Sequence, residues 1–102
     1  MVVRRNREER YLAILEVIRH GVSIPSRIMG EANVDWNFFH SALFYAKGEE
    51  HVIKVESDDD KERFKRYKLT VKGADEIIRL RDGGELPDFS ENGSLTPYKE
   101  QF

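Results

Sequence analysis

The chain has 102 residues, of which 39% are hydrophobic and 35% are charged, and its formal net charge is −2 at pH 7. These values predict one globular domain and argue against a strongly basic nucleic-acid binder. The chain contains no cysteine, which excludes disulfides, thiolate metal sites and a cysteine nucleophile. Its apolar runs are too short to span a bilayer, and its N-terminus lacks the apolar stretch of a signal peptide, so we expect a cytoplasmic protein.

Two helices are predicted in the first third of the chain. Apolar residues recur at helical spacing over residues 7–20. A second helix is predicted to begin near Pro25, because proline is tolerated in the first helical turn. Its N-cap is either Ser23 or a residue of the tighter sequence Ile24–Pro25–Ser26. Asn33 ends this helix, since asparagine can adopt the left-handed conformation found at many helix C-termini.

A third helix is predicted over residues 35–47, where Asp35 suits both the N-cap position and the positive end of the helix. Gly48 ends it. The helical spacing divides its side chains into two faces. The inward stripe consists of Val34, Phe38, Phe39, Ala42, Leu43 and Ala46. The outward face consists of Trp36, Asn37, His40, Ser41 and Phe44.

Two strands and a fourth helix complete the predicted elements. Residues 51–56 are rich in β-branched side chains, and residues 63–69 alternate between two faces. The polar loop between them, residues 57–62, is predicted to be an exposed hairpin tip that turns at Asp58 to Lys61. The last helix starts after Thr70 and ends at Gly83–Gly84. The predicted core consists of Ile14, Leu15, Ile18, Ile28, Phe39, Leu43, Tyr67, Leu69 and Ile77.

Two segments carry a resemblance to a known family. Ser26–Asp35 has the pattern of a helix, a turn and the start of a recognition helix, and Tyr67–Gly73 has that of a second wing strand entering the last helix. Over about residues 7–82 the chain resembles the winged-helix-turn-helix family, especially its small archaeal DNA-binding regulators. The resemblance implies an α+β winged helix, with a recognition helix at about 35–47 and a wing at about 51–69.

The expected domain organisation follows from this resemblance and from charge. Residues 1–82 are expected to form the winged-helix domain, with a basic N-terminal arm that contains Arg4, Arg5, Arg7 and Arg10. The arm either follows a DNA backbone or is a soluble terminus. Residues 83–102 lack periodicity, and we expect a tail that is flexible or draped over the domain and dispensable for folding from Glu85 on.

Eight residues are candidates for DNA contact: Trp36, Asn37, His40, Ser41, Arg63, Lys65, Arg66 and Lys68. The polar side chains on the recognition helix can read base edges or form an ordinary solvated face. The basic residues of the second strand can neutralise phosphates or balance the acidic hairpin tip. Trp36 and Phe44 can stack on bases or contact thymine methyls, but they fit a protein interface or the core better.

Two features depart from the family pattern. The outward helix face offers few basic side chains, and Asp58–Asp60 make the wing tip acidic where a basic residue often enters the minor groove. These departures fall on the surfaces that would contact DNA, and a fold does not by itself dictate a function.

Two functions remain open from the sequence. The first is a sequence-specific, duplex-DNA-binding transcriptional regulator that forms a homodimer, and the second is a winged-helix protein-interaction module that does not bind DNA directly. No Ser/His/Asp set, phosphate-cradling loop or paired-carboxylate site stands out, so an enzyme is not expected. The three histidines lack metal-ligand spacing, and we expect neither a metal nor another cofactor.

Overall fold

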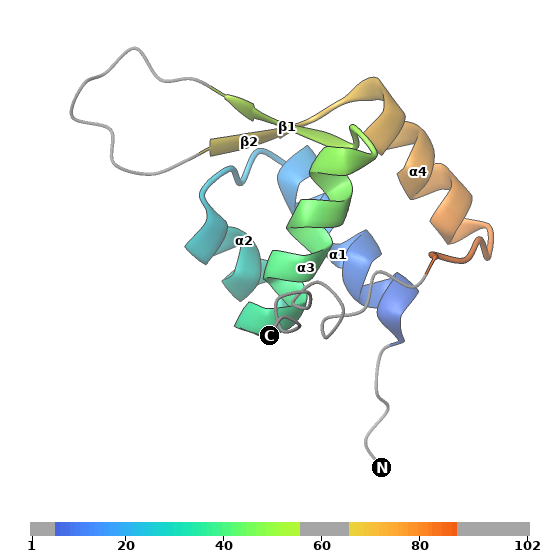
Figure 1. Cartoon of the computed structure of the whole chain (residues 1–102), viewed down its shortest axis with the longest axis horizontal. Helices are drawn as coiled ribbons and strands as arrows, with labels where there is room; N and C mark the ends of the chain where they lie inside the picture. Colours follow the sequence, from blue (N-terminus) through green and yellow to red (C-terminus); the bar gives the residue numbers. More distant parts are fainter. Residues whose placement is uncertain (1–5, 56–65, 88–102) are drawn as a thin grey trace, which may run out of the picture.

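The computed structural model describes residues 6–55 and 66–87 (Figure 1). Its elements are α1 (Arg7–Arg19), α2 (Pro25–Ala32), α3 (Trp36–Gly48), β1 (Val52–Val55), β2 (Arg66–Leu69) and α4 (Val71–Arg81). This order of helices, a two-stranded antiparallel wing and a C-terminal helix is the predicted α+β winged helix. Within the described ranges, no helix combines the length and the apolar character that crossing a membrane requires.

A capping box starts α1. The side chain of Asn6 accepts a hydrogen bond from the backbone N–H of Glu9 at 2.7 Å, and the N–H of Asn6 donates to Oε1 of Glu9 at 2.9 Å. These bonds satisfy two of the backbone donors that a helix N-terminus leaves without partners. The sequence analysis placed the start of this helix at the right residue but did not use this signal.

The turn between α2 and α3 forms as predicted. Asn33 has φ 59° and ψ 54°, the left-handed conformation, and Asp35 caps α3 by accepting from the N–H of Phe38 at 2.8 Å. The left-handed residue reverses the chain, and the cap fixes where the next helix begins. The left-handed Asn33 and the Asp35 cap together set the direction of α3 relative to α2.

Of the two N-caps predicted for α2, Ser23 is wrong and the tighter alternative within Ile24–Pro25–Ser26 is confirmed. The N-cap is Ile24, and no side chain caps this helix. Ser23 instead binds β2, because its carbonyl oxygen accepts from the N–H of Tyr67 at 3.0 Å and its hydroxyl accepts from Nη1 of Arg66 at 3.2 Å. The Ser23 hydroxyl is therefore bound by a residue 43 positions away in sequence instead of capping the nearby helix.

The wing is an antiparallel pair in which Val52 is opposite Leu69 and Val55 is opposite Arg66. Side chains alternate across such a pair, so Tyr67 turns towards the core while Lys68 is exposed on the other face. β1 begins at Val52 rather than at the predicted His51, and residues 56 and 63–65 of the predicted strands lie outside the described residues. The predicted hairpin tip, residues 57–62, and its turn at Asp58 to Lys61 lie outside the described residues.

Thr70 joins the wing to α4. Its Oγ1 accepts from the N–H of Gly73 at 3.0 Å, which makes it the predicted N-cap of α4. The same hydroxyl and the N–H of Thr70 each donate to the carbonyl oxygen of His51, both at 3.0 Å. One residue therefore caps the last helix and holds it to the start of β1.

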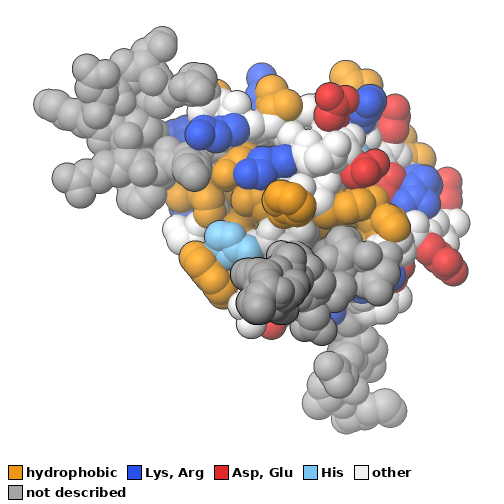
Figure 2. Space-filling view, viewed as in Figure 1, with side chains coloured by type: hydrophobic (Ala, Val, Ile, Leu, Met, Phe, Trp, Pro, Cys, Tyr) orange, Lys and Arg blue, Asp and Glu red, His pale blue; other side chains and the backbone are white. Residues whose placement is uncertain are grey.

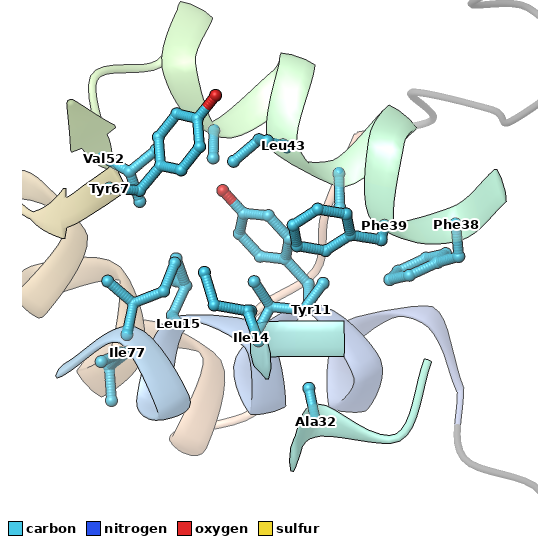
Figure 3. Packing of buried hydrophobic residues seen from close by; sticks show 14 of the residues in the cluster. Tyr11, Ile14, Leu15, Ala32, Phe38, Phe39, Leu43, Val52, Tyr67 and Ile77 are labelled. Atoms are coloured by element: carbon cyan, nitrogen blue, oxygen red, sulfur yellow. The ribbon is translucent and has the colours of Figure 1, made fainter. Parts of the chain in front are cut away.

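The core lies between α1, α3, α4 and the base of the wing (Figure 3). Figure 3 shows side chains of α1 facing those of α3, with Val52 and Tyr67 at the wing end of the cluster. Of the nine residues predicted for the core, eight are buried, and Leu69 is half-buried against the cluster. The cluster also includes Tyr11, Phe38, Ala32, Ala42, Ala46, Val52, Leu80 and Leu86.

The beginning of the predicted tail belongs to the domain. Leu86 is only 5% exposed. Its N–H donates to Glu8 at 2.9 Å, and Arg7 donates to the carbonyl oxygens of Leu86 at 3.0 Å and of Pro87 at 2.6 Å. The residues from Glu85 on are therefore not expected to be dispensable for folding, because Leu86 fills part of the core. The division of the chain at residue 83 stays a prediction, and residues 88–102 lie outside the described residues.

A buried polar pair ties α1 to the root of the wing. The hydroxyl of Tyr11 lies 2.7 Å from Nδ1 of His51, and His51 is 7% exposed. Burial raises the pKa of Tyr11, so the phenol stays protonated, and the tautomer of the His51 ring determines which of the two groups donates the hydrogen bond. Burial also lowers the pKa of His51, although the nearby Glu76 carboxylate opposes the shift.

The lowered pKa of His51 predicts a loss of stability in mild acid. The unfolded chain takes up a proton near pH 6.5 and the folded chain only at a lower pH, so the free energy of unfolding falls as pH drops below about 6.5. Urea unfolding from about pH 8 to about pH 5 should show this slope. His51→Asn, which keeps an acceptor for Tyr11, should flatten it, whereas His20→Asn at an exposed site should not. An equal slope in wild type and His51→Asn would contradict the prediction.

Candidate nucleic-acid interface

The outer face of α3 carries a continuous row of aromatic side chains. Trp36 is 63% exposed and Phe44 is 73% exposed. His40 lies between them, and the ring centroids of Trp36 and His40 are 3.8 Å apart. Residues four apart lie on the same face of a helix, so these three side chains form one surface, called here the aromatic stripe (Trp36, His40 and Phe44). Asn37 is exposed beside it.

Ser41 is not on this surface. The sequence analysis placed it on the outward face, but the structure buries it to 6% exposure. The buried arc of α3 is wider than the predicted stripe, because Phe38 and Phe39 both point into the core and the small serine side chain lies among covered neighbours. The prediction that Ser41 lies on the outward face is therefore wrong, and its position gives no support to a contact with DNA.

A hollow of about 270 Å³ borders the aromatic stripe. It lies between α3, the start of α2 and β2, and its lining consists of Pro25, Phe39, His40, Leu43, Phe44, Lys47 and Tyr67. The ammonium group of Lys47 is 5.8 Å from the centre of the Tyr67 ring. Partial burial, and then the charge of Lys47, lower the pKa of His40. At neutral pH the His40 ring is therefore uncharged, with one donor and one acceptor nitrogen.

The base of the wing supplies the positive charge near α3. Lys54 lies opposite Tyr67 in the strand register, so both side chains belong to the face of the wing that turns towards α3. Lys68 is exposed on the other face. Lys47, Lys54 and Lys68 form no ion pair with any residue in the described part of the chain. Their charges are available to an anionic partner.

Of the basic residues predicted to contact DNA, Arg66 also has a structural role. Arg66 is half-buried and donates to Ser23, so its first role is to hold β2 to the segment before α2. Arg63 and Lys65 lie outside the described residues. Lys54 was missed as a candidate, because only the pairing of β1 with β2 brings it to the same face of the wing as Tyr67.

The basic N-terminal arm is partly engaged within the domain. Arg7 binds the carbonyl oxygens of Leu86 and Pro87. The guanidinium of Arg10 lies 4.2 Å from the centre of the Phe38 ring. Both side chains stabilise the fold, and the remaining arginines of the arm lie outside the described residues.

The charges around α3 are distributed unevenly (Figure 2). Figure 2 shows hydrophobic side chains in the middle of this face, with Lys and Arg side chains towards the wing and a mixture of acidic and basic side chains towards α4. Across residues 6–55 and 66–87, no three His, Asp or Glu side chains come together as a metal site would need. The arrangement is an exposed aromatic helix face with cations on one side.

Comparison with protein families gives one match that covers most of the chain. A model of the winged helix-turn-helix family matches residues 4–85. A search of curated protein sequences found no significant match.

Solved structures with the same fold belong to MarR-family regulators. The multiple antibiotic-resistance repressor MarR from Listeria monocytogenes is 15% identical, with a TM-score of 0.57 over 89% of this chain and 60% of that one. A variant of ZitR from Lactococcus lactis is 17% identical, with a TM-score of 0.60 over 99% of this chain and 62% of that one. Wild-type ZitR in complex with DNA is 16% identical, with a TM-score of 0.56 over 99% and 62%. This chain thus spans about three fifths of the length of these relatives, and identities this low show a shared fold.

Proposed function

Because the chain belongs to the winged helix-turn-helix family, we propose that it is a sequence-specific duplex-DNA-binding transcriptional regulator. It acts by binding rather than by catalysis. The observation that carries this proposal is the exposed outer face of α3 beside lysines of α3 and the wing that form no ion pair with a residue of ranges 6–55 and 66–87. The structure of ZitR in complex with DNA, which shares the fold, supports it.

In the proposed complex, α3 enters the major groove. The first turns of a recognition helix contact base edges in helix-turn-helix proteins, and this part of α3 presents Trp36, Asn37 and His40. Asn37 can pair bidentately with adenine, and the neutral His40 ring can donate or accept one hydrogen bond. Sequence preference then comes from these side chains.

Phosphate contacts come from the end of α3 and from the wing. Lys47, Lys54 and Lys68 are the exposed cations there, and Arg63, Lys65 and Arg66 add to them in the proposal. Such contacts position the protein and provide most of the affinity without reading sequence.

A homodimer completes the proposal. Two recognition helices about one helical turn of DNA apart, ~34 Å, would bind a palindromic site. A regulator works where the chromosome lies, so the proposed location is the cytoplasm.

A salt titration tests duplex binding. Fluorescence anisotropy with random and selected duplexes at low salt should give a steep fall in affinity as salt rises, because bound phosphates release counterions. Lys68→Ala should weaken binding to all sequences alike and reduce the slope of log K against log salt by about 0.9. Lys72→Ala removes an exposed lysine that is already paired with Glu50 at 2.8 Å, and it should leave the slope unchanged.

The second candidate function is a protein-interaction module. The exposure of Trp36 and Phe44, at 63% and 73%, favours it, because large exposed apolar surfaces often mark protein interfaces. If micromolar protein binds no duplex at low salt, the regulator proposal fails and this function replaces it, with Trp36 as the first residue to mutate.

A further inference from the structure

The face of α3 that would enter the groove is largely apolar. Trp36 and Phe44 expose most of their surfaces, while the hydrogen-bonding groups beside them are the side chains of Asn37 and His40. Removing exposed aromatic surface from water is favourable by roughly 25 cal/mol per Å². A partner that fits this face therefore offers apolar groups among polar ones.

The major groove of DNA offers one apolar group, the C5 methyl of thymine. We propose that the aromatic stripe contacts thymine methyl groups and that the protein consequently prefers half-sites made of A·T pairs. This inference rests on the proposed function, because it requires α3 to lie in the major groove. Asn37 strengthens the same preference, since an asparagine amide matches the N6 and N7 edge of adenine.

The distance between Trp36 and Phe44 along α3 determines how far apart the contacted methyl groups lie. Trp36 and Phe44 are eight positions apart on a continuous helix, which corresponds to ~12 Å at 1.5 Å per residue. Bases on one strand rise ~3.4 Å per step, so the two rings lie about three to four steps apart. Asn37 lies at the Trp36 end, where it can read an adenine next to the first methyl.

The charges around the stripe favour DNA over a protein as its occupant. Lys47 lines the hollow that the stripe borders, and Lys54 lies on the face of the wing that turns towards it. Both are exposed and form no ion pair with a described residue. An apolar stripe flanked by exposed cations matches the thymine methyls and the phosphates of one duplex.

Two duplexes that differ only in the methyl group test the inference. The probes are alternating poly(dA-dT) and the corresponding poly(dA-dU), in which deoxyuridine replaces thymidine. Loss of each contacted methyl should raise Kd about fourfold, which is ~0.8 kcal/mol at 1.4 kcal/mol per tenfold. With two contacts, the wild-type protein should bind the dA-dU duplex about fifteenfold more weakly.

Variants of the stripe identify the residues that read the methyl. Trp36→Ala and Phe44→Ala should each reduce the ratio of the two Kd values to about fourfold, and the double variant should reduce it to about one. Ile78→Ala is the matched control, because Ile78 is 59% exposed on α4 rather than α3. It should keep the wild-type ratio. Circular dichroism melts of all variants show that each one is folded.

Each of the remaining outcomes contradicts either the reading of methyl groups or the proposed function itself. Equal Kd values for the two wild-type complexes overturn methyl reading but leave duplex binding intact, as expected if the stripe binds a protein or a second copy of the chain. A ratio that persists in the double variant also overturns the inference, because the preference then arises elsewhere. Binding to neither duplex overturns the proposed function itself.

Discussion

Gly73→Ala is expected to destabilise the domain by about 1–3 kcal/mol, after the gain of about 1 kcal/mol that alanine has over glycine in a helix. A Cβ at Gly73 would collide with the carbonyl oxygen of His51 and would lie 2.7 Å from Cδ1 of Leu69. Overpacking of this kind costs about 1–3 kcal/mol. The displaced His51 carbonyl is also the acceptor for Thr70, which caps α4, and a lost N-cap costs about 1 kcal/mol more.

Gly30→Ala is the matched control for this substitution. Gly30 is also a helical glycine, but a Cβ there would have no neighbour within 4 Å. Alanine is favoured over glycine in a helix by about 1 kcal/mol, so this variant should be more stable than wild type. Urea unfolding of both variants measures the two free energies. A Gly73→Ala protein as stable as Gly30→Ala would show that α4 does not approach the root of the wing this closely.

The parts of the fold that could be predicted from sequence are those with local signals. Asn33, Asp35 and Thr70 each act within three or four residues, through a left-handed turn or a cap. The period of the apolar residues gave the buried face of α1 correctly. Ser23 and Leu86 could not be placed this way, because β2 and α1 determine what they contact.

The candidate site was harder to predict for the same reason. The exposure of Trp36, Asn37 and His40 follows from helical periodicity and was predicted. Ser41 was misplaced because the width of the buried arc depends on how closely α3 packs against its neighbours. Lys54 became a candidate only through the strand register, which brings it to the same face as Tyr67.

Leu43→Ala is expected to cost about 2–5 kcal/mol of folding free energy, the range for a buried leucine that leaves a cavity. Leu43 is 6% exposed, and its side chain points from α3 into the cluster near Tyr67 (Figure 3). Thermal and urea unfolding should both show the loss. An unchanged melting temperature would mean that α3 is rotated about its axis relative to the structure.

The neighbouring residue tests the opposite face of the same helix. Phe44 is 73% exposed, and surface substitutions usually change stability by less than about 0.5 kcal/mol. Phe44→Ala should therefore unfold like wild type while binding duplex DNA more weakly, whereas any loss of binding in Leu43→Ala should follow its loss of folded protein. Adjacent positions then separate the two roles of α3, because one side chain holds the helix in the core and the next is the one proposed to contact DNA. If Phe44→Ala were as unstable as Leu43→Ala, the exposed aromatic face would be part of the core rather than a surface for a partner.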